Sequence, residues 1–333
     1  ETASREPVNY VLPPGVTRII DSGQSQITQL NEQSMQMKVQ DLKAGDARGI
    51  YRKNSMDLRI YKRLQMFVHN EALIDDHTNL SKGDVSVFIR MGSDVKNNYY
   101  EYEIPLKLTP EGRYSWQSAN DRSKVWPMEN MLDVDMSVFT KVKKARNIAR
   151  SEGKVSYNQI FSEYDADKPN NKISIVGNPS LGEVKTMVIG VRNLASTEKS
   201  GEVWVNELRL KDYNNEGGWA ASGHFNVQLS DFGTVNLTGH YMTDGFGGLE
   251  DNALQRSNET QKSYSMVANL ELGKFFPDKA KVNIPFYYSV SKDEVRPKYN
   301  PLDTDMNLDD ALDAMSSHER DSVEYIAVTK KLS

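Results

Sequence analysis

Four segments in the last third of the chain alternate apolar and polar residues over nine to eleven positions each. They run from Trp219 to Leu229, Thr234 to Met242, Ser263 to Leu272 and Val282 to Ser291. Alternation with a period of two predicts β-strands, because successive side chains of a strand point to opposite faces of its sheet. A tilted strand that crosses a bilayer needs about 9–11 residues, whereas ordinary strands have about 5–6. The length therefore favours lipid over a protein core as the cover of the apolar face.

The alternation assigns the side chains of these segments to two faces. On the apolar face, which we expect to contact lipid, lie Trp219, Phe225, Val227, Leu229, Val235, Leu237, Tyr241, Tyr264, Leu270, Leu272, Val282, Ile284 and Phe286. On the polar face, which we expect to line a lumen, lie Asn226, Gln228, Asn236, Thr238, Asn269 and Asn283. An apolar outside and a polar inside are typical of transmembrane β-barrels. A one-sided sheet of a water-soluble domain alternates in the same way, so the pattern leaves that alternative open.

Aromatic residues and loop lengths indicate an orientation for these strands. If the strands are antiparallel, one end carries Trp219, Tyr241, Tyr264 and Tyr288, and the other carries Phe232, Phe275 and Phe276. Aromatic residues at both interfaces are typical of membrane barrels. The connections at the phenylalanine end are short, and those at the other end are long. Because outer-membrane barrels have short periplasmic turns and long extracellular loops, we expect the first strand to descend from the cell exterior.

Four strands cannot close a barrel, and an open edge in lipid would leave backbone groups unpaired. We therefore expect further strands from a longer parent chain or from other copies of this one. In the closing stretch "DSVEYIAVTKKLS", Val323, Tyr325 and Ala327 alternate, which predicts the beginning of a fifth strand. The chain begins without Met and without a signal peptide, so we expect a fragment or a processed piece of a longer polypeptide.

The rest of the chain divides into further predicted regions, and the predicted fold class is all-β. Residues 1–33 are expected to form an extended arm, and residues 34–212 a jelly-roll-like β-sandwich with one helix from Pro127 to about Arg150. Residues 213–291 would form two transmembrane hairpins. Residues 292–333 would form an acidic loop with a short helix around Leu308 and Leu312, followed by the start of a further strand.

Composition and missing motifs exclude several classes of function. The 41 basic and 46 acidic residues give a net charge of −5, and no basic stripe is present, so we expect no nucleic-acid partner. The absence of Cys excludes disulfides, Cys-zinc sites and thiol nucleophiles. No run of 18 apolar residues exists, which excludes a helical membrane span, and the mean hydropathy of −0.63 does not argue against strand-built spans. Without HExxH, a phosphate loop or a GxSxG elbow, we expect no enzyme.

Two features leave alternatives open. Glu207 in "GEVWVNELRL" occupies a place where carbohydrate-binding modules carry an acidic residue for structural calcium, but companion carboxylates are lacking. We therefore expect no cofactor, with calcium near Glu207 as the alternative. Six aromatic residues either fill the core of the sandwich or form a platform that stacks on sugars. These are Tyr99, Tyr100, Tyr102, Tyr114, Trp116 and Trp126.

Several strings of the sequence resemble a known family. They are "LNEQSM" with "DLKAGDARGIYR", "FIRMGSD" with "NYYEYEIPLKLTP", "GEVWVNELRL" with "GGWAA", and "ANLELGKFFP" with "YNPLDTD". Together they resemble the SprA/Sov family, the very large outer-membrane proteins of Bacteroidetes that are associated with gliding motility and type IX secretion. The resemblance covers residues 9–305.

This resemblance implies that the chain is an internal fragment of a giant barrel, the translocon that moves folded cargo proteins to the cell surface. The sandwich would then be cap-like and extracellular. The implied partners are outer-membrane lipid, the remainder of the parent barrel chain, a plug protein, a PorV-like barrel protein and secreted cargo proteins. The alternative function is a surface carbohydrate-binding module or adhesin with two soluble β-domains.

Overall fold

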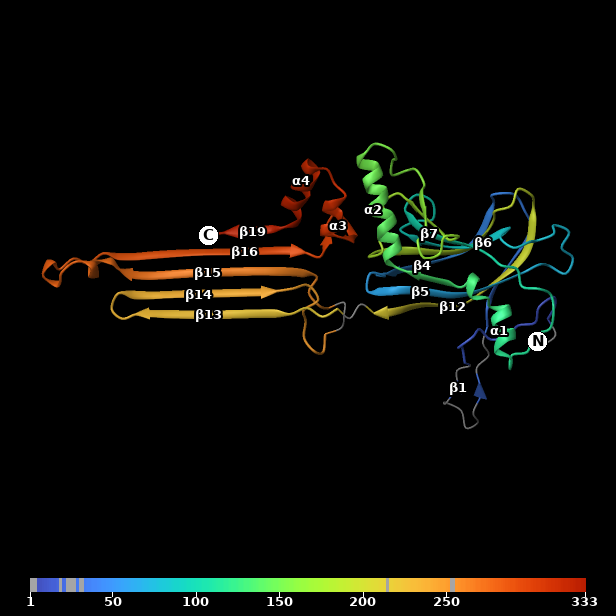
Figure 1. Cartoon of the computed structure of the whole chain (residues 1–333), viewed down its shortest axis with the longest axis horizontal. Coiled ribbons are helices and arrows are strands. Elements are labelled where there is room, and N and C mark those ends of the chain that lie inside the picture. Colours follow the sequence, from blue (N-terminus) through green and yellow to red (C-terminus); the bar gives the residue numbers. More distant parts are fainter. Residues whose placement is uncertain (1–4, 18–19, 22–27, 30–32, 214–215, 252–254) are drawn as a thin grey trace. The chain divides into compact units, whose positions relative to one another are not determined.

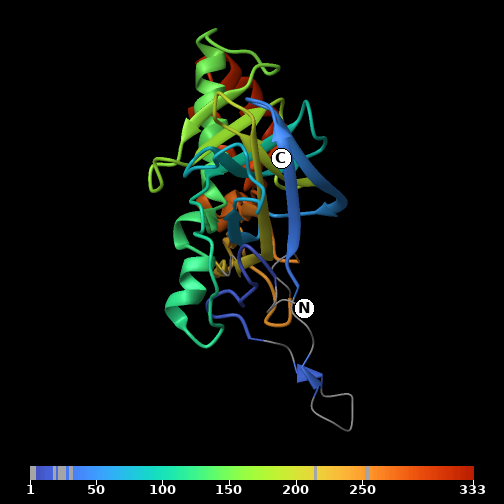
Figure 2. The same cartoon turned by 90° about the vertical axis from the view of Figure 1, so that its right-hand side faces the viewer.

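The computed structural model of the chain divides into two compact units, Glu1–Tyr213 and Asn214–Ser333. Antiparallel sheets dominate both units (Figures 1 and 2), which confirms the predicted all-β class. The structure describes residues 5–17, 20–21, 28–29, 33–213, 216–251 and 255–333. Most of the predicted arm between residues 18 and 32 lies outside the described residues, apart from a short pair of β1 (Ile20–Asp21) with β2 (Thr28–Gln29).

The first unit contains a six-stranded sheet with the order β4-β11-β6-β7-β10-β9. Its strands are β4 (Ala47–Met56), β6 (Val85–Gly92), β7 (Tyr99–Pro105), β9 (Phe161–Tyr164), β10 (Lys172–Val176) and β11 (Val184–Asn193). Strands β6 and β7 form a hairpin, in which Ile89 lies opposite Tyr102 and Met91 opposite Tyr100. These pairs place the bulky apolar side chains on one face.

A four-stranded sheet packs against this face. Its order is β3-β12-β5-β8, with β3 (Met35–Leu42), β5 (Tyr61–Glu71), β8 (Leu132–Asp135) and β12 (Lys199–Tyr213). The register of β12 with β5 shifts between Asn206 and Arg209. Glu207 at this bulge has a φ of 55°, the left-handed region that a bulged strand uses to bend.

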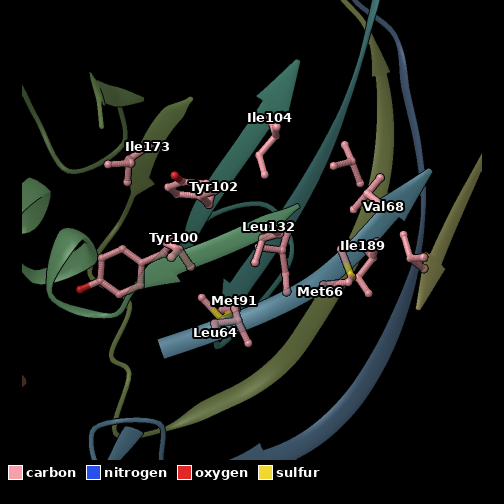
Figure 3. Close-up of a cluster of buried hydrophobic side chains, with 14 of the residues drawn as sticks. Leu64, Met66, Val68, Met91, Tyr100, Tyr102, Ile104, Leu132, Ile173 and Ile189 are labelled. Atoms are coloured by element: carbon pink, nitrogen blue, oxygen red, sulfur yellow. The ribbon is translucent and has the colours of Figure 1, made fainter. Parts of the chain in front are cut away.

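The core of the sandwich lies between the two sheets (Figure 3). Leu64 and Met66 from β5 share this core with Ile89 from β6, and all three side chains are at most 1% exposed. Burial of one such side chain stabilises a fold by about 1.5–3 kcal/mol. Tyr102 is also fully buried, and its hydroxyl donates to Asp165 Oδ2 at 2.6 Å and accepts from Asn171 Nδ2 at 3.0 Å. The phenol is therefore satisfied inside the core.

The helix predicted from Pro127 to Arg150 is wrong up to residue 136. There the structure has a 3₁₀ turn, η2 (Met128–Asn130), and then β8, before α2 (Ser137–Ser151) begins. The residues of "LDVD" alternate, and β8 buries Leu132 and Val134 by pairing with β5. The pairing with β5 therefore prevails over helical propensity. A further helix, α1 (Ala119–Val125), was not predicted from the sequence.

Residues 5–17 pack onto the sandwich without forming a regular strand. Val8 and Val11 are 0% and 2% exposed and contact Trp126 and Trp204 in a second apolar cluster. The Trp126 indole donates to the Val11 carbonyl at 2.7 Å. This part of the arm is fixed by burial rather than by a ladder of hydrogen bonds.

The second unit contains a five-stranded antiparallel sheet with the order β13-β14-β15-β16-β19 (Figure 1). The strands are β13 (Ala220–Leu229), β14 (Gly233–Met242), β15 (Glu259–Glu271), β16 (Pro285–Pro297) and β19 (Thr329–Leu332). Each of the four predicted segments contains a strand, but β15 begins earlier and β16 begins later and ends later than predicted.

The connection from β15 to β16 contains two 3₁₀ turns, η3 (Leu272–Phe275) and η4 (Asp278–Ala280). Leu272, Val282, Asn283 and Ile284 therefore lie outside the strands, in contrast to the prediction. The reason lies in Glu271, whose carboxylate accepts from Gly273 N at 3.1 Å and from Ile284 N at 2.6 Å. These bonds occupy amides that a longer ladder would use.

A small third cluster lies beyond β16. It comprises β17 (Tyr299–Asn300), β18 (Asp303–Asn307), α3 (Leu308–Asp313) and α4 (Ser317–Ala327). The short helix predicted around Leu308 and Leu312 is present as α3. A fifth strand, β19, does lie in the closing stretch and pairs with β16, but it begins only at Thr329. Val323, Tyr325 and Ala327, whose alternation predicted the strand, belong to α4. A Ser316–Glu319 capping box starts that helix, and Val323 and Ala327 pack with the leucines of α3.

Candidate functional site

The register of the five-stranded sheet separates its side chains into two faces. In one row, Phe225 lies opposite Leu237, and Met266 and Val290 continue the row on β15 and β16. The adjacent row begins with Asn226 opposite Asn236. Because partners in a row share a face, the apolar and polar sets predicted within the strands lie on opposite sides of one sheet.

The apolar face is exposed. Phe225 is 60% exposed, Leu237 40% and Phe286 42%, and Ala268 is the only buried side chain among the residues of these five strands. Val227 pairs with Val235, Leu270 pairs with Phe286, and Leu229 and Tyr264 lie on the same face beside Gly233 and Gly239. A sheet that folds against a second layer buries such a face, so this surface has the character of one that water does not normally cover.

The opposite face is mostly uncharged and polar near the centre of the sheet. Gln228, Thr234 and Asn269 form one row, and Thr238 lies opposite His224, with 3.1 Å between Thr238 Oγ1 and His224 Nδ1. Two apolar side chains that the sequence reading did not include, Val267 and Tyr287, also lie on this face by register.

At the short-turn end, phenylalanine rings cluster. Phe232 lies in the turn from β13 to β14, and its ring stands 5.0 Å from that of Phe275 in edge-to-face geometry. Lys274 Nζ lies 2.7 Å from Asp231 Oδ2 and joins the two turns. The hydrogen bond and charge of this ammonium lower the pKa of the Asp231 carboxyl.

Tyr288 was expected at the opposite end, and the register corrects this. It pairs with Ala268, in the row next to Leu270 and Phe286, and so lies toward the phenylalanine end. The reason is that β16 begins only at Pro285. Trp219 and Tyr241 do share the other end, where their ring centroids are 4.9 Å apart.

Beyond the tyrosine row, β15 and β16 continue with charged residues. Lys262, Glu294 and Lys330 share the face of Tyr241, and the ammonium of Lys262 lies 5.8 Å from the Tyr241 ring. Both strands are 13 residues long, so they extend past the apolar band. The sequence reading missed this extension because charges at both parities hide the alternation in "VSKDEVR".

The helical cluster is tied to this charged end. The Arg296 guanidinium donates to Asp309, at the start of α3, and lies 3.7 Å from Glu324 of α4. Lys298 Nζ lies 2.9 Å from Asp244 in the loop after β14. Burial alone would lower the pKa of Lys298, but the hydrogen bond and charge of Asp244 outweigh burial and raise it. These pairs fix the helices and the long loop to the same end of the sheet.

The described part of the chain contains no group of three or more His, Asp or Glu side chains that could hold a metal ion. Glu207, where calcium was the alternative to the expected absence of a cofactor, pairs with Arg209 two residues away. No helix among the described residues has the length and apolar character needed to cross a membrane.

The chain was compared with models of known protein families. The model of SprA_N, described as motility related/secretion protein, matches residues 1–312. No curated protein matches the chain.

Proposed function

The chain belongs to the SprA_N family of motility related/secretion proteins, and from this premise we propose that it is a structural part of an outer-membrane channel for secreted proteins. The membership confirms the resemblance found in the sequence and gives the chain a motility- or secretion-related role. This family is not an enzyme family. We propose that the chain has no catalytic role and no cofactor, and that its setting is type IX secretion and gliding motility in Bacteroidetes.

The observation that carries the proposal is the exposed apolar face opposite a polar one. From Leu270 to Tyr264, the apolar band extends about 20 Å along β15 at the usual rise per residue. Outer-membrane barrels present an apolar band about 25 Å tall. Hydrocarbon would cover Phe225 and Leu237, while Asn226, Asn236 and Asn269 would line a water-filled lumen. Uncharged polar side chains there would let polypeptides pass without strong ionic or apolar contacts.

An open edge supports a larger wall. β13 is an edge strand, and no strand in the described part of the chain pairs with its outer side. Each unpaired backbone group in hydrocarbon costs several kcal/mol, so a membrane sheet must continue until it closes. We propose that the remainder of a longer parent chain supplies these strands.

The two ends of the sheet suggest its orientation. We assign the short turns with Phe232 and Phe275 to the periplasmic interface, and the Trp219–Tyr241 end to the outer interface. The chain enters β13 at the Trp219 end, so the unit that precedes it would be exposed at the cell surface. Cargo proteins, a plug protein and a PorV-like barrel protein remain the partners we propose from the resemblance.

Single-cysteine labelling tests the proposal, since the chain has no Cys of its own. Leu237→Cys and Asn236→Cys, each carrying a nitroxide in the outer-membrane protein, form a matched pair of neighbours on opposite faces. We expect the Leu237 label to be accessible to oxygen and shielded from a water-soluble nickel complex. The Asn236 label should be accessible to the nickel complex. Shielding of the Leu237 label from both reagents would mean that protein covers this face, and the channel assignment would fail.

The alternative, a carbohydrate-binding module or adhesin, has less support. Tyr100 and Tyr102 lie in the sandwich core and Trp126 lies in the cluster under the arm, so the structure favours the core interpretation for these aromatics. Trp116, 64% exposed, is the aromatic of the set that remains available for stacking on a sugar. One exposed indole is a smaller platform than the sequence pattern suggested.

A further inference from the structure

Strand β4 forms an open edge of the six-stranded sheet. In the described part of the first unit, β4 pairs with β11 on one side and with no strand on the other. Residues 48–55 are all exposed, including Ile50 at 43% and Tyr51 at 66%. Figure 2 shows the blue strands of this region at the margin of the unit, away from the green helices. A long exposed edge strand is a template for pairing with another chain.

Backbone hydrogen bonds identify which amides of β4 point outward. Asn193 N donates to the Asp46 carbonyl at 3.0 Å, so this carbonyl faces β11, whereas Asp46 N donates to the Lys43 carbonyl in the preceding turn. Because direction alternates along an antiparallel pair, Arg48, Ile50 and Arg52 also bond to β11. Leu194 N donates to Asp84, next to β6, which agrees with this alternation. The N–H and C=O groups of Gly49, Tyr51 and Lys53 therefore face away from the sheet.

The side chains of β4 give this edge a sign of charge. Arg48, Arg52 and Lys53 are its charged residues, and the strand contains no acid. The Arg48 side chain is 68% exposed, and its carboxylate neighbour, Asp46, is 3.9 Å away. By alternation, Ile50 lies between the two arginines on one face, and Tyr51 lies beside Lys53 on the other. The edge thus offers apolar contacts flanked by cations, in a protein whose net charge is −5.

We propose that β4 binds an extended acidic segment of a partner polypeptide, which adds to the sheet as an antiparallel strand. Backbone bonds to Gly49, Tyr51 and Lys53 would give affinity, and opposite charges would select the partner. An antiparallel ladder is favoured because it is slightly more stable per residue than a parallel one. A second copy of β4 fits poorly, because antiparallel pairing about Ile50 places Arg48 of one copy opposite Arg52 of the other. This site is independent of the proposed membrane sheet.

A designed peptide tests the site on the full chain. In antiparallel alignment, fluorescein-labelled Thr-Glu-Glu-Val-Val-Thr-Glu-Thr places glutamates opposite Lys53, Arg52 and Arg48, and valines opposite Tyr51 and Ile50. Its matched control carries Lys in place of each Glu. We expect fluorescence anisotropy to show saturable binding of the glutamate peptide, weaker at high salt, and no binding of the lysine peptide. Equal binding of both peptides, or of neither, would overturn the proposal.

Two variants at Tyr51 separate backbone pairing from side-chain contact. Tyr51→Pro removes an outward N–H without removing a bond to β11, and proline is tolerated at such edge positions. Tyr51→Thr removes the same ring and keeps the N–H. We expect the proline variant to bind the glutamate peptide about tenfold more weakly than the threonine variant, as loss of a backbone bond and a steric block predict. Equal affinities would exclude strand addition.

A charge-reversed variant gives a result that does not depend on proline. With Arg48→Glu, Arg52→Glu and Lys53→Glu together, the lysine peptide should bind and the glutamate peptide should not. Thermal unfolding of each variant verifies the fold. Sedimentation of the unmodified chain covers the other occupant: a dimer that Tyr51→Pro abolishes, without peptide binding, would assign the edge to a second copy and refute the acidic partner.

Discussion

The sandwich and the five-stranded sheet contain the same alternation and treat it in opposite ways. In the sandwich, Met66 and Val68 of β5 are 1% exposed because a second sheet faces them. In the other sheet, Phe225 and Leu237 are 60% and 40% exposed. The period-two pattern specifies that one face must leave water, but it does not specify what covers that face.

Strand length does not distinguish the two regions either. β5 has 11 residues and β12 has 15, although both belong to the sandwich. The length that favoured a membrane from the sequence is therefore shared by buried strands. The difference lies in the presence of a complementary layer, because Ile89 and Tyr102 of the six-stranded sheet share one core cluster with Leu64 of the four-stranded sheet.

The largest contrast is expected from truncating a side chain in the sandwich core. Leu64→Ala should lower the free energy of unfolding by about 2–5 kcal/mol, because it leaves a cavity between two packed sheets. Denaturant unfolding measures the change. Leu208→Ala is the control, since Leu208 is 40% exposed and its loss should cost no more than about 0.5 kcal/mol. Similar effects at the two positions would contradict the assignment of the core.

A charge on the exposed apolar face should act only where lipid covers it. In the assembled outer-membrane protein, Leu237→Arg should cost about 2–4 kcal/mol, as expected near the middle of a bilayer. The amount of protein recovered in the outer-membrane fraction should fall accordingly. Asn236→Arg, one residue away on the polar face, should assemble normally. Equal recovery of both variants would argue that no lipid contacts Leu237.

A smaller contrast concerns tyrosine hydroxyls. Tyr102→Phe removes the bond to the buried Asp165 and should destabilise the sandwich by about 1–2 kcal/mol. Tyr264→Phe, on the exposed face, should change the stability by less than about 0.5 kcal/mol. Thermal denaturation followed by circular dichroism compares the two. A neutral Tyr102→Phe would mean that the hydroxyl network does not stabilise the core.

The smallest effect is expected at the Asp231–Lys274 pair in the exposed turns. The ammonium lowers the pKa of Asp231, so the pair contributes stability above the usual aspartate pKa and loses it as the pH falls through the lowered value. In Lys274→Ala, the pKa of Asp231 should rise toward its ordinary value. Carboxyl chemical shifts followed against pH by NMR measure both. An unchanged titration would show that the ion pair does not persist in solution.

Much of the site could be predicted from the sequence because parity survives errors in strand boundaries. Phe225 and Leu237 lie on one face of the sheet and Asn236 on the other, as the alternation predicts, although β15 and β16 begin and end elsewhere than predicted. Tyr288 was misplaced because its position along the strand, unlike its parity, depends on where β16 begins. That boundary is set by the Glu271 carboxylate, which bonds to Ile284 across the turn.

Other errors came from contacts between distant segments. "LDVD" is a strand because β5 lies beside it, and nothing local to residues 132–135 indicates this partner. The stretch from Val323 to Ala327 fits both a period of two and a period near four. The helical cap at Ser316 and the leucines of α3 select the second.

The tall strands β15 and β16 have a mechanical consequence. Four residue pairs join β16 to β19, directly after α4, and Arg296 links β16 to both helices. Traction on α4 along the strands would load these ladder bonds in shear, so that several bonds resist together. The helices are thus harnessed to the stiffest direction of the sheet rather than suspended from a single flexible loop.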